Sequence, residues 1–301
     1  MAVVINTNVD SLKIQNLLTN STSKMSSTMQ RMSSGMKILS AKDDAAGTVI
    51  SAKMQVQLNG NQIAQKNVQN ANALLSTAEG NLDVVEDNIT RIRDLTLQAK
   101  NGTYSNEEIK AMQDEVDQRI KEIDRINNSA EYSSLRLFGD ENGLAKNGAT
   151  FQVGADAGVD NTIKAEESLF AKVTFSALTG IGETKFSLTE LAKNAGFTAD
   201  NVDEKGDDEV DFDTAIRALD NAINNITNRK STIGSAGNRM DSALATLTTQ
   251  YENLSSAKSI ITDADVAAEA SNFTQQQILQ QVSTSLLAQA NQAPSIALSL
   301  V

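Results

Sequence analysis

Few side chains in this chain could carry out catalysis or bind a metal. It contains no histidine and no cysteine, which excludes an imidazole base, a thiolate nucleophile and a Cys/His zinc site. Asp43 and Asp44 are adjacent carboxylates, but neighbouring residues on a helix point away from each other. Because Ala45 and Ala46 follow them, we expect the pair to cap the start of a helix. We therefore predict no catalytic residue.

Two segments resemble ligand-binding loops in composition only. The stretch T179GIGETK185 is rich in glycine but lacks the GxxxxGK[ST] spacing of a phosphate-binding loop. The acidic stretch D200NVDEKGDDEVD211 could suggest a calcium loop. When Gly206 is aligned with the invariant glycine of such a loop, Lys205 falls on a ligand position and Phe212 replaces the bidentate Glu. We predict no cofactor, no metal ion and no enzymatic activity.

The composition restricts the classes of partner. The net charge is −12 at pH 7, which argues against nucleic acid. The first residues, MAVVINTNVD, lack a basic region followed by an apolar stretch, so we expect no secretory signal peptide. No long apolar run occurs, so we expect no membrane span. Aromatic residues make up only 4% of the chain, which favours thin helix seams over a thick globular core.

The strongest periodic signal lies between residues 64 and 99. Apolar or small residues there keep an alternating 4,3 spacing, the heptad repeat of a coiled-coil seam. They are Ala64, Val68, Ala71, Leu75, Ala78, Leu82, Val85, Ile89, Ile92, Thr96 and Ala99. Asn101 and Gly102 predict the end of this helix. Ser105, with Glu108 three residues later, predicts a capping box that opens the next one.

Two further ladders predict partners for this helix. The second, after a short turn that implies antiparallel packing, carries Ile109, Met112, Val116, Ile120 and Ile123. The third comprises Ile216, Leu219, Ile223, Ile226, Ile233, Met240, Leu244, Leu247, Tyr251, Leu254 and Ile261. Lys230, Gly237 and Lys258 interrupt this third seam, and Gly237 suggests a close approach of two backbones. We expect the third helix to dock on the first two, because one helix cannot bury such a stripe alone.

The two ends of the chain carry weaker stripes and opposite charges. A 4,3,4,3 pattern near the N-terminus comprises Met25, Met29, Met32, Met36 and Leu39, and a looser stripe near the C-terminus comprises Phe273, Ile278, Val282, Leu286 and Ala290. Residues 1–42 hold five basic side chains against Asp10, whereas residues 259–301 hold three carboxylates and no basic side chain. We expect the ends to pair, and their adaptable methionines suit a surface that packs between subunits.

The centre of the chain differs in character. Residues 140–213 hold 16 carboxylates against six lysines. F151QVGADAGVDNTI163 alternates weakly around glycine turns and predicts a hairpin. A171KVTF175 and T184KFSL188 are further strand candidates. Residues 200–213 read as an acidic loop.

Several long motifs resemble those of bacterial flagellin, the subunit of the flagellar filament. On the N-terminal side they are INTN (5–8), SSGMKILSAKDDAAG (33–47), TLQAKNGTYS (96–105) and QDEVDQRIKEIDRI (113–126). On the C-terminal side they are DADVAAEASNFTQQQILQQ (263–281) and LAQANQAPSIALSL (287–300). The motifs occur in the order of the family, and the resemblance covers about residues 1–165 and 212–301.

The resemblance and the ladders together predict a mainly α fold. It is an elongated antiparallel helical bundle with a small β-hairpin region, in which the N- and C-terminal helices pair. The resemblance implies an inner terminal domain made of residues 1–43 and 262–301. It implies an outer helical core made of 44–172, which includes the hairpin, and 212–261. A short variable acidic insert of residues 173–211 remains.

The resemblance also implies a structural function. The chain would polymerise with copies of itself into the extracellular flagellar filament and serve swimming. It would be exported unfolded by the flagellar type III system. The further partners implied are an export chaperone and the cap and hook-junction proteins of the flagellum.

An innate immune receptor is a further implied partner. In the family, Toll-like receptor 5 reads a Gln-Arg pair and a nearby Leu on the first long helix, supported by a Glu on the second. The corresponding positions are Thr90, Arg91, Leu95 and Glu115, and Thr90 replaces the Gln. We expect Arg91 and Leu95 to share a face outside the heptad seam. The alternative is an ordinary surface pair of Asp87 with Arg91, with Leu95 flanking the core.

Other functions remain as alternatives. A hook–filament junction protein shares the terminal helices, but the DDAAG motif before a long seam and the ANQAP tail favour flagellin. A helical sensor would need a membrane span or a ligand pocket, and an enzyme would need a catalytic group. The sequence departs from the family at Gly237, commonly Gln, at Ile260, frequently Arg, and at Ala270, commonly a larger apolar residue. These departures bear on contacts between subunits.

Overall fold

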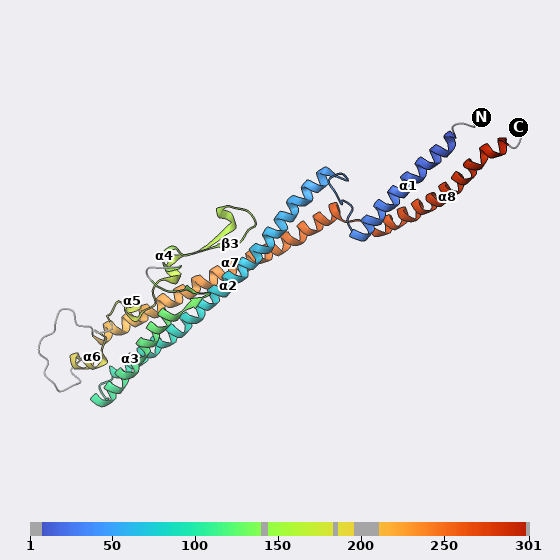
Figure 1. The fold of residues 1–301 in the computed structure, drawn as a ribbon. Coiled ribbons are helices and arrows are strands. Elements are labelled where there is room, and N and C mark those ends of the chain that lie inside the picture. The colour runs from blue at the N-terminus through green and yellow to red at the C-terminus, as the bar shows by residue number, and fades with distance from the viewer. Residues whose placement is uncertain (1–7, 140–143, 183–185, 196–210, 299–301) are drawn as a thin grey trace. The chain divides into compact units, whose positions relative to one another are not determined.

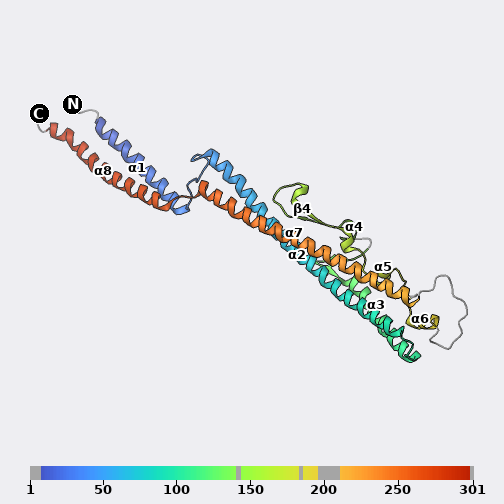
Figure 2. The same ribbon diagram turned by 180° about the vertical axis from the view of Figure 1, so that it is seen from behind.

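The computed structural model describes residues 8–139, 144–182, 186–195 and 211–298. The chain divides into two compact units. One comprises residues 1–59 and 251–301, and the other comprises residues 60–250. Helices α2 (Ala45–Ala99) and α7 (Phe212–Thr262) contribute to both units (Figure 1). In the terminal unit, α1 (Val9–Ser34) and α8 (Val266–Leu298) lie side by side and run antiparallel (Figures 1 and 2).

The core of the second unit forms along the heptad seam of α2. Every seam residue from Ala64 to Ala99 is at most 2% exposed. Helix α3 (Asn106–Ser129) packs antiparallel on α2 and buries Ile109, Val116, Ile120 and Ile123. Helix α7 covers both with Leu219, Ile226 and Ile233. The predicted bundle of three helices is therefore confirmed, and burial of these aliphatic side chains provides its main driving force.

The turn between α2 and α3 follows the predicted chemistry. Helix α2 ends at Ala99, just before Asn101 and Gly102. The hydroxyl of Ser105 accepts a hydrogen bond from the backbone N–H of Glu108, and the Glu108 carboxylate accepts one from the N–H of Ser105. This reciprocal capping box satisfies two backbone donors at the start of α3.

Lys230, Lys258 and Gly237 interrupt the apolar seam of α7. The two lysines make polar contacts with α2, whereas Gly237 faces open space. The ammonium group of Lys230 reaches Asp83 Oδ1 at 2.6 Å and Glu86 Oε2 at 2.8 Å on α2. Lys258 donates to the side-chain oxygen of Gln55 at 2.5 Å. A Cβ added at Gly237 would meet nothing within 4 Å. Within the described part of a single chain, Gly237 therefore makes no close backbone approach of the kind expected.

Two antiparallel hairpins pack near the bundle. The predicted hairpin is confirmed as β3 (Ala149–Gln152) paired with β4 (Thr162–Ala165), with Phe151 opposite Ile163. Ile163 and the partly buried Phe151 pack on the α2 and α7 seams. A shorter hairpin, β1 (Glu131–Tyr132) with β2 (Leu135–Arg136), has no counterpart in the sequence predictions.

The two further strand candidates are wrong. Phe175 begins a short helix, α5 (Phe175–Thr179), and Leu188 begins α6 (Leu188–Asn194). No described residue of A171KVTF175 or T184KFSL188 lies in a strand. The backbone N–H groups of Val173 and Leu188 donate to the side chains of Asn127 and Gln113 on α3. Side-chain acceptors on α3 thus replace the strand partner that the apolar pattern suggested.

Short elements complete the second unit. They are α4 (Leu144–Asn147) and the 3₁₀ turns η1 (Val159–Asn161) and η2 (Glu167–Phe170). Within the expected insert, Phe175 and Phe186 meet edge to face, with ring centroids 5.0 Å apart, and both are buried in the core. Most of the expected acidic loop, residues 200–210, lies outside the described residues.

The contrast between two glycines gives a stability prediction. Gly237→Ala should raise the free energy of unfolding by about 1 kcal/mol, because alanine favours a helix and its Cβ fits without contact. Gly60→Ala is the matched control on α2. Its Cβ would lie 2.7 Å from Ala155 Cβ, so the helix gain should be cancelled by displacement of the hairpin loop. Urea unfolding followed by circular dichroism measures both, and a destabilising Gly237→Ala would contradict the prediction.

Candidate assembly surfaces

The terminal helices α1 and α8 meet through small and polar side chains. In the described part of the two helices, only Ser21, Thr28 and Ser283 have buried side chains. Hydrogen bonds across the pair include those that Asn8 donates to the carbonyl of Ala290 at 2.8 Å, Ser11 to Asn291 Oδ1 at 2.8 Å and Gln280 to the hydroxyl of Thr22 at 3.4 Å. Among the side chains of this pair whose burial the structure describes, none that is apolar is buried to the degree found in the second unit. The pair therefore lacks the main stabilising term of a folded helix bundle.

A large apolar surface remains exposed on the same two helices. Ile278 is 55% exposed, Val282 48% and Leu286 46%, and they recur every fourth residue along one face of α8. Leu279 lies beside them at 42%. The other exposed apolar residues of this unit on α1, α8 and the segment between α1 and α2 are Val9, Leu12, Leu17, Met29, Met36, Leu39 and Val266. Exposed apolar faces of this kind mark sites of association.

The structure distributes the expected N-terminal seam over several environments. Met25 and Met32 are half-buried, whereas Met29, Met36 and Leu39 are exposed. The five residues do not form one helical stripe, because α1 ends at Ser34 and Gly35 adopts a left-handed conformation with φ 70°. A left-handed glycine is a common helix terminator. Met36 instead forms an isolated β-bridge with Asp263.

The expected C-terminal seam is helical but has two faces. All its residues lie in α8. Phe273 and Ala290 are half-buried, whereas Ile278, Val282 and Leu286 are exposed. The partly or fully buried stripe is Glu269, Phe273, Gln276, Gln280, Ser283, Leu287 and Ala290. This stripe has heptad spacing, but the polar residues in it prevented its prediction from the apolar pattern.

Three segments meet at a junction where α1 ends and α8 begins: the turn after α1, the end of α7 and the residues just before α8. The N–H of Lys37 donates to the carbonyl of Thr262 at 2.6 Å, and the N–H of Ala264 donates to the carbonyl of Gly35 at 2.9 Å. The guanidinium of Arg31 lies 3.5 Å from a Glu269 carboxylate oxygen. It also lies 3.9 Å from Asp43. We expected the basic N-terminal end to complement the acidic C-terminal end. Among the described residues, Arg31 and Glu269 form such an ion pair across α1 and α8.

Two carboxylates organise the chain at this junction. The backbone N–H and hydroxyl of Ser40 donate to Asp43, and these hydrogen bonds lower the pKa of Asp43. The hydroxyls of Ser259 and Thr262 likewise lower the pKa of Asp263. Asp44 caps α2 by accepting from the N–H of Gly47 at 2.9 Å. The expected helix cap is confirmed for Asp44, while Asp43 accepts hydrogen bonds within the preceding turn.

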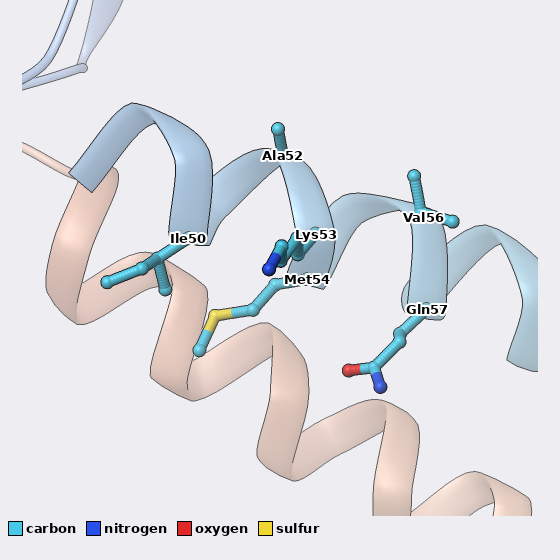
Figure 3. Close-up of a pocket in the computed structure, with 6 residues that line it drawn as sticks. All are labelled: Ile50, Ala52, Lys53, Met54, Val56 and Gln57. Carbon is cyan, nitrogen blue, oxygen red and sulfur yellow. The ribbon is translucent and has the colours of Figure 1, made fainter. Parts of the chain in front are cut away.

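A shallow hollow of about 610 Å³ lies along the first turns of α2. It is lined by Ile50, Ala52, Lys53, Met54, Val56 and Gln57. Figure 3 shows Ile50 and Met54 pointing toward the neighbouring helix, while Ala52 and Val56 point away from it. Val56 is 71% exposed. The hollow is open and its exposed lining is mainly apolar in spite of Lys53 and Gln57, so it resembles a contact surface more than a small-molecule site.

The expected receptor positions are only partly brought together. Arg91 and Glu115 form a two-pronged ion pair, with nitrogen–oxygen distances of 2.9 and 3.2 Å. This pair lowers the pKa of Glu115 and raises that of Arg91. Thr90 is exposed on the same helix, whereas Leu95 is only 2% exposed and belongs to the core. Leu95, which the sequence places off the heptad seam, is buried in the core, in line with the alternative in which it flanks the core. Arg91 pairs with Glu115 rather than with Asp87.

Neither a metal centre nor a membrane span is found in the part of the chain that the structure describes. No group of three His, Cys, Asp or Glu side chains there is placed to hold a metal ion. None of the described helices combines the length and the apolar character needed to cross a bilayer.

Two family descriptions match the chain. The bacterial flagellin N-terminal helical region matches residues 5–143, and the bacterial flagellin C-terminal helical region matches residues 216–301. Together they cover most of the chain and include α1, α2, α3, α7 and α8, the helices that build the bundle and the terminal pair.

Relatives are similar over the full length. The flagellin of Bacillus subtilis (strain 168) is 34% identical over 99% of both chains. The flagellin of Serratia marcescens is 35% identical over the whole of both chains. A solved structure from Vibrio parahaemolyticus, described as that of a flagellar hook-associated protein, has a TM-score of 0.56 at 17% identity. It covers 73% of this chain and 99% of its own, and this likeness concerns the fold alone.

The junction predicts a defined response to acid. A carboxyl group whose pKa is lowered by folding stabilises the fold above its unfolded pKa, near 3.9 for Asp, and loses this contribution as the pH falls through the folded pKa. Asp43 and Asp263 should therefore release the junction below about pH 4. The amide resonances of Leu39 and Ser40, whose N–H groups donate to Asp43, should shift in that window.

The variant Asp43→Ala should show the released resonances already at neutral pH, with little further change on acidification. Asp160→Ala, at an exposed turn, is the control and should behave like the parent. An Asp43→Ala spectrum at pH 7 that matches the parent around Ser40 would contradict the role of this carboxylate.

Proposed function

The chain belongs to the bacterial flagellin family and is a flagellar filament subunit, and we propose that its two terminal helices build the filament for swimming. The observation that carries this proposal is the helix pair α1–α8. It buries Ser21, Thr28 and Ser283 but leaves Ile278, Val282 and Leu286 in water. Neighbouring subunits would cover these apolar residues, so assembly would supply the burial that the single chain lacks.

The proposed mechanism couples folding of the ends to polymerisation. An ordered helix pair costs conformational entropy for every residue it fixes, and the pair on its own offsets little of that cost by burial. The α2–α3–α7 bundle has no such deficit, because its seam is closed within one chain. We therefore propose that residues 1–43 and 262–301 are the polymerising inner part and that the remaining helices form a preformed outer part, with residues 173–211 as the insert.

Export and further partners follow from the same premise. We propose that the chain leaves the cell unfolded through the flagellar type III system, and that it meets an export chaperone and the cap and hook-junction proteins. The exposed apolar residues of α8 support a need for protection before assembly. The absence of cysteine from the sequence fits an extracellular filament.

The alternative of a hook–filament junction protein rests on shared terminal helices. The Vibrio parahaemolyticus structure shows that such a fold is compatible with this chain, but its 17% identity carries no functional weight against the full-length relatives. Electron microscopy separates the two functions, since a filament subunit forms long polymers and a junction protein forms short caps.

Removal of the ends tests the proposal as a whole. A chain lacking roughly residues 1–40 and 265–301 should remain helical and monomeric, because the seam of α2 is retained. The full-length protein should form long filaments under the same salt conditions. Sedimentation and electron microscopy measure both, and long filaments from the truncated chain would refute the role of the ends.

A point substitution tests the apolar face of α8. Val282→Ser should leave the circular dichroism of the monomer unchanged, because Val282 is 48% exposed there. It should raise the critical concentration for polymerisation roughly tenfold, since the lost burial is worth about 1.5 kcal/mol. Gln277→Ser is the control, because Gln277 is exposed and lies away from the Ile278–Leu286 face. Equal effects of the two substitutions would argue against this face.

The receptor function remains a proposal with a narrower site. Arg91, Glu115 and Thr90 are available at the surface, whereas Leu95 would contribute only by supporting Arg91 from the core. Arg91→Ala should weaken binding of monomer to Toll-like receptor 5, and Thr90→Gln should strengthen it about fivefold through one added hydrogen bond of about 1 kcal/mol. Surface plasmon resonance with monomer measures both. Unchanged binding by Arg91→Ala would show that this face is not the receptor site.

A further inference from the structure

Four Asn-Gly dipeptides offer the chain a chemical modification that needs no enzyme. They are Asn59–Gly60, Asn101–Gly102, Asn142–Gly143 and Asn147–Gly148. In such a pair the backbone nitrogen of Gly attacks Cγ of Asn and forms a C–N bond. The Cγ–Nδ2 bond breaks, the proton of the attacking nitrogen is lost through solvent to the leaving group, and ammonia departs. One water then opens the resulting succinimide to aspartate or isoaspartate, so the reaction is a hydrolysis without oxidation.

The reaction has geometric requirements that local structure can meet or deny. The backbone nitrogen must be free of a hydrogen bond, and the Asn side chain must rotate over it. A helical residue, with ψ near −42°, holds the following nitrogen in an i→i−4 hydrogen bond and away from its own Cγ. Reaction from a helix therefore needs a prior local opening, and its rate falls with the population of the open state.

Asn101–Gly102 meets these requirements. Both residues are exposed in the turn between α2 and α3. The N–H of Asn101 donates to the carbonyl of Gln98, and the carbonyl of Asn101 accepts from Thr103. Within the described residues, no hydrogen bond involves the N–H of Gly102 or the carboxamide of Asn101. The nucleophile and the electrophile are both accessible to water and free to approach.

In the other two described Asn-Gly pairs, hydrogen bonds restrain the reacting groups. Asn59–Gly60 lies inside α2, and the Asn59 side-chain oxygen accepts from Gln55 Nε2 at 2.8 Å. Asn147 is the last residue of α4, and the N–H of Gly148 donates to the carbonyl of Leu144 at 2.9 Å. Gly148 is also confined, since a Cβ there would lie 2.3 Å from the Ala165 carbonyl oxygen. Asn142–Gly143 lies outside the described residues and takes no part in this comparison.

We propose that, among the three described Asn-Gly pairs, Asn101 is the one that deamidates spontaneously in the native protein, and that folding protects Asn59 and Asn147. The product adds one negative charge at the C-terminal end of α2, where the helix dipole disfavours an anion. It also lies next to Lys100, whose ammonium group contacts Asp213 at 2.6 Å. The new carboxylate would compete with Asp213 for this lysine at the end of the α2–α7 pair.

Peptide mapping by mass spectrometry tests the proposal on the intact, folded chain. The protein is incubated at pH 8 and 37 °C, and the deamidated fraction of the peptides around positions 59, 101 and 147 is followed over weeks. Asn101 should deamidate at least about tenfold faster than Asn59 and Asn147, because each of those requires an opening step. Similar native rates at the three positions, or a faster rate at Asn59 or Asn147, would overturn the proposal.

The same chain in 8 M urea supplies the matched control. There all three pairs are unfolded, so their rates should converge to within about threefold and the ranking should depend on sequence alone. A tenfold advantage of Asn101 that persists in urea would show that folding does not select the site. The variant Asn101→Gln should form less of the acidic species that isoelectric focusing resolves early in the incubation than the parent, because it loses deamidation at position 101 but keeps Asn142. Early acidic species of equal amount in the variant would also contradict the assignment.

Discussion

The main physical constraint on this structure is that the two ends of the chain bury too little apolar surface. Helices α1 and α8 pair over their length, yet their described buried side chains are Ser21, Thr28 and Ser283. Apolar residues such as Leu17 and Ile278, each more than half exposed, face water instead. Since apolar burial is the dominant stabilising term in folding, the pair within one chain lacks most of that term. We propose that neighbouring subunits supply it in the filament, so that the ends become ordered in the polymer.

The second unit, in contrast, buries its apolar side chains within one chain. The seam from Ala64 to Ala99 is closed by α3 and α7. Lys230 between Asp83 and Glu86, and Arg93 against Asp220, place charge pairs at fixed points along α2 and α7. A charged or polar residue at a seam position selects register at some cost in stability. The division of labour is thus between a rigid bundle and ends that respond to neighbours.

Periodicity and capping chemistry were sufficient to predict the bundle. The heptad seam of α2 and the Ser105–Glu108 capping box appear where the spacing placed them, because local rules and burial agree there. The strand candidates around Val173 and Phe186 failed because side-chain acceptors of α3 satisfy the backbone that a strand would have paired. The β1–β2 hairpin was missed because Ser133 and Ser134 take left-handed φ values of 50° and 67°. Asn and Gly usually signal such a turn.

The candidate assembly surfaces were harder to predict, for a physical reason. Sequence reasoning places apolar stripes against a partner helix, but the α1–α8 contact uses Ser, Thr and Gln and leaves several apolar residues exposed. Met36 and Leu39 were assigned to a helical stripe that Gly35 terminates. Leu95 was expected to share a face with Arg91 outside the seam, whereas it is buried in the core. The α1–α8 contact and the burial of Leu95 depend on packing between distant segments, which periodicity along the chain does not encode, whereas the error at Met36 and Leu39 comes from the local helix end at Gly35.

Hydrogen exchange measured by mass spectrometry on monomer and on polymer tests the central claim most directly. The account predicts that peptides from α1 and α8 exchange rapidly in the monomer and become at least about 100-fold slower in the polymer, as burial by neighbours suppresses local opening. Peptides from the α2 seam between Ala64 and Ala99 should be slow in both states. Protection of α1 and α8 in the monomer equal to that of the α2 seam would contradict the account.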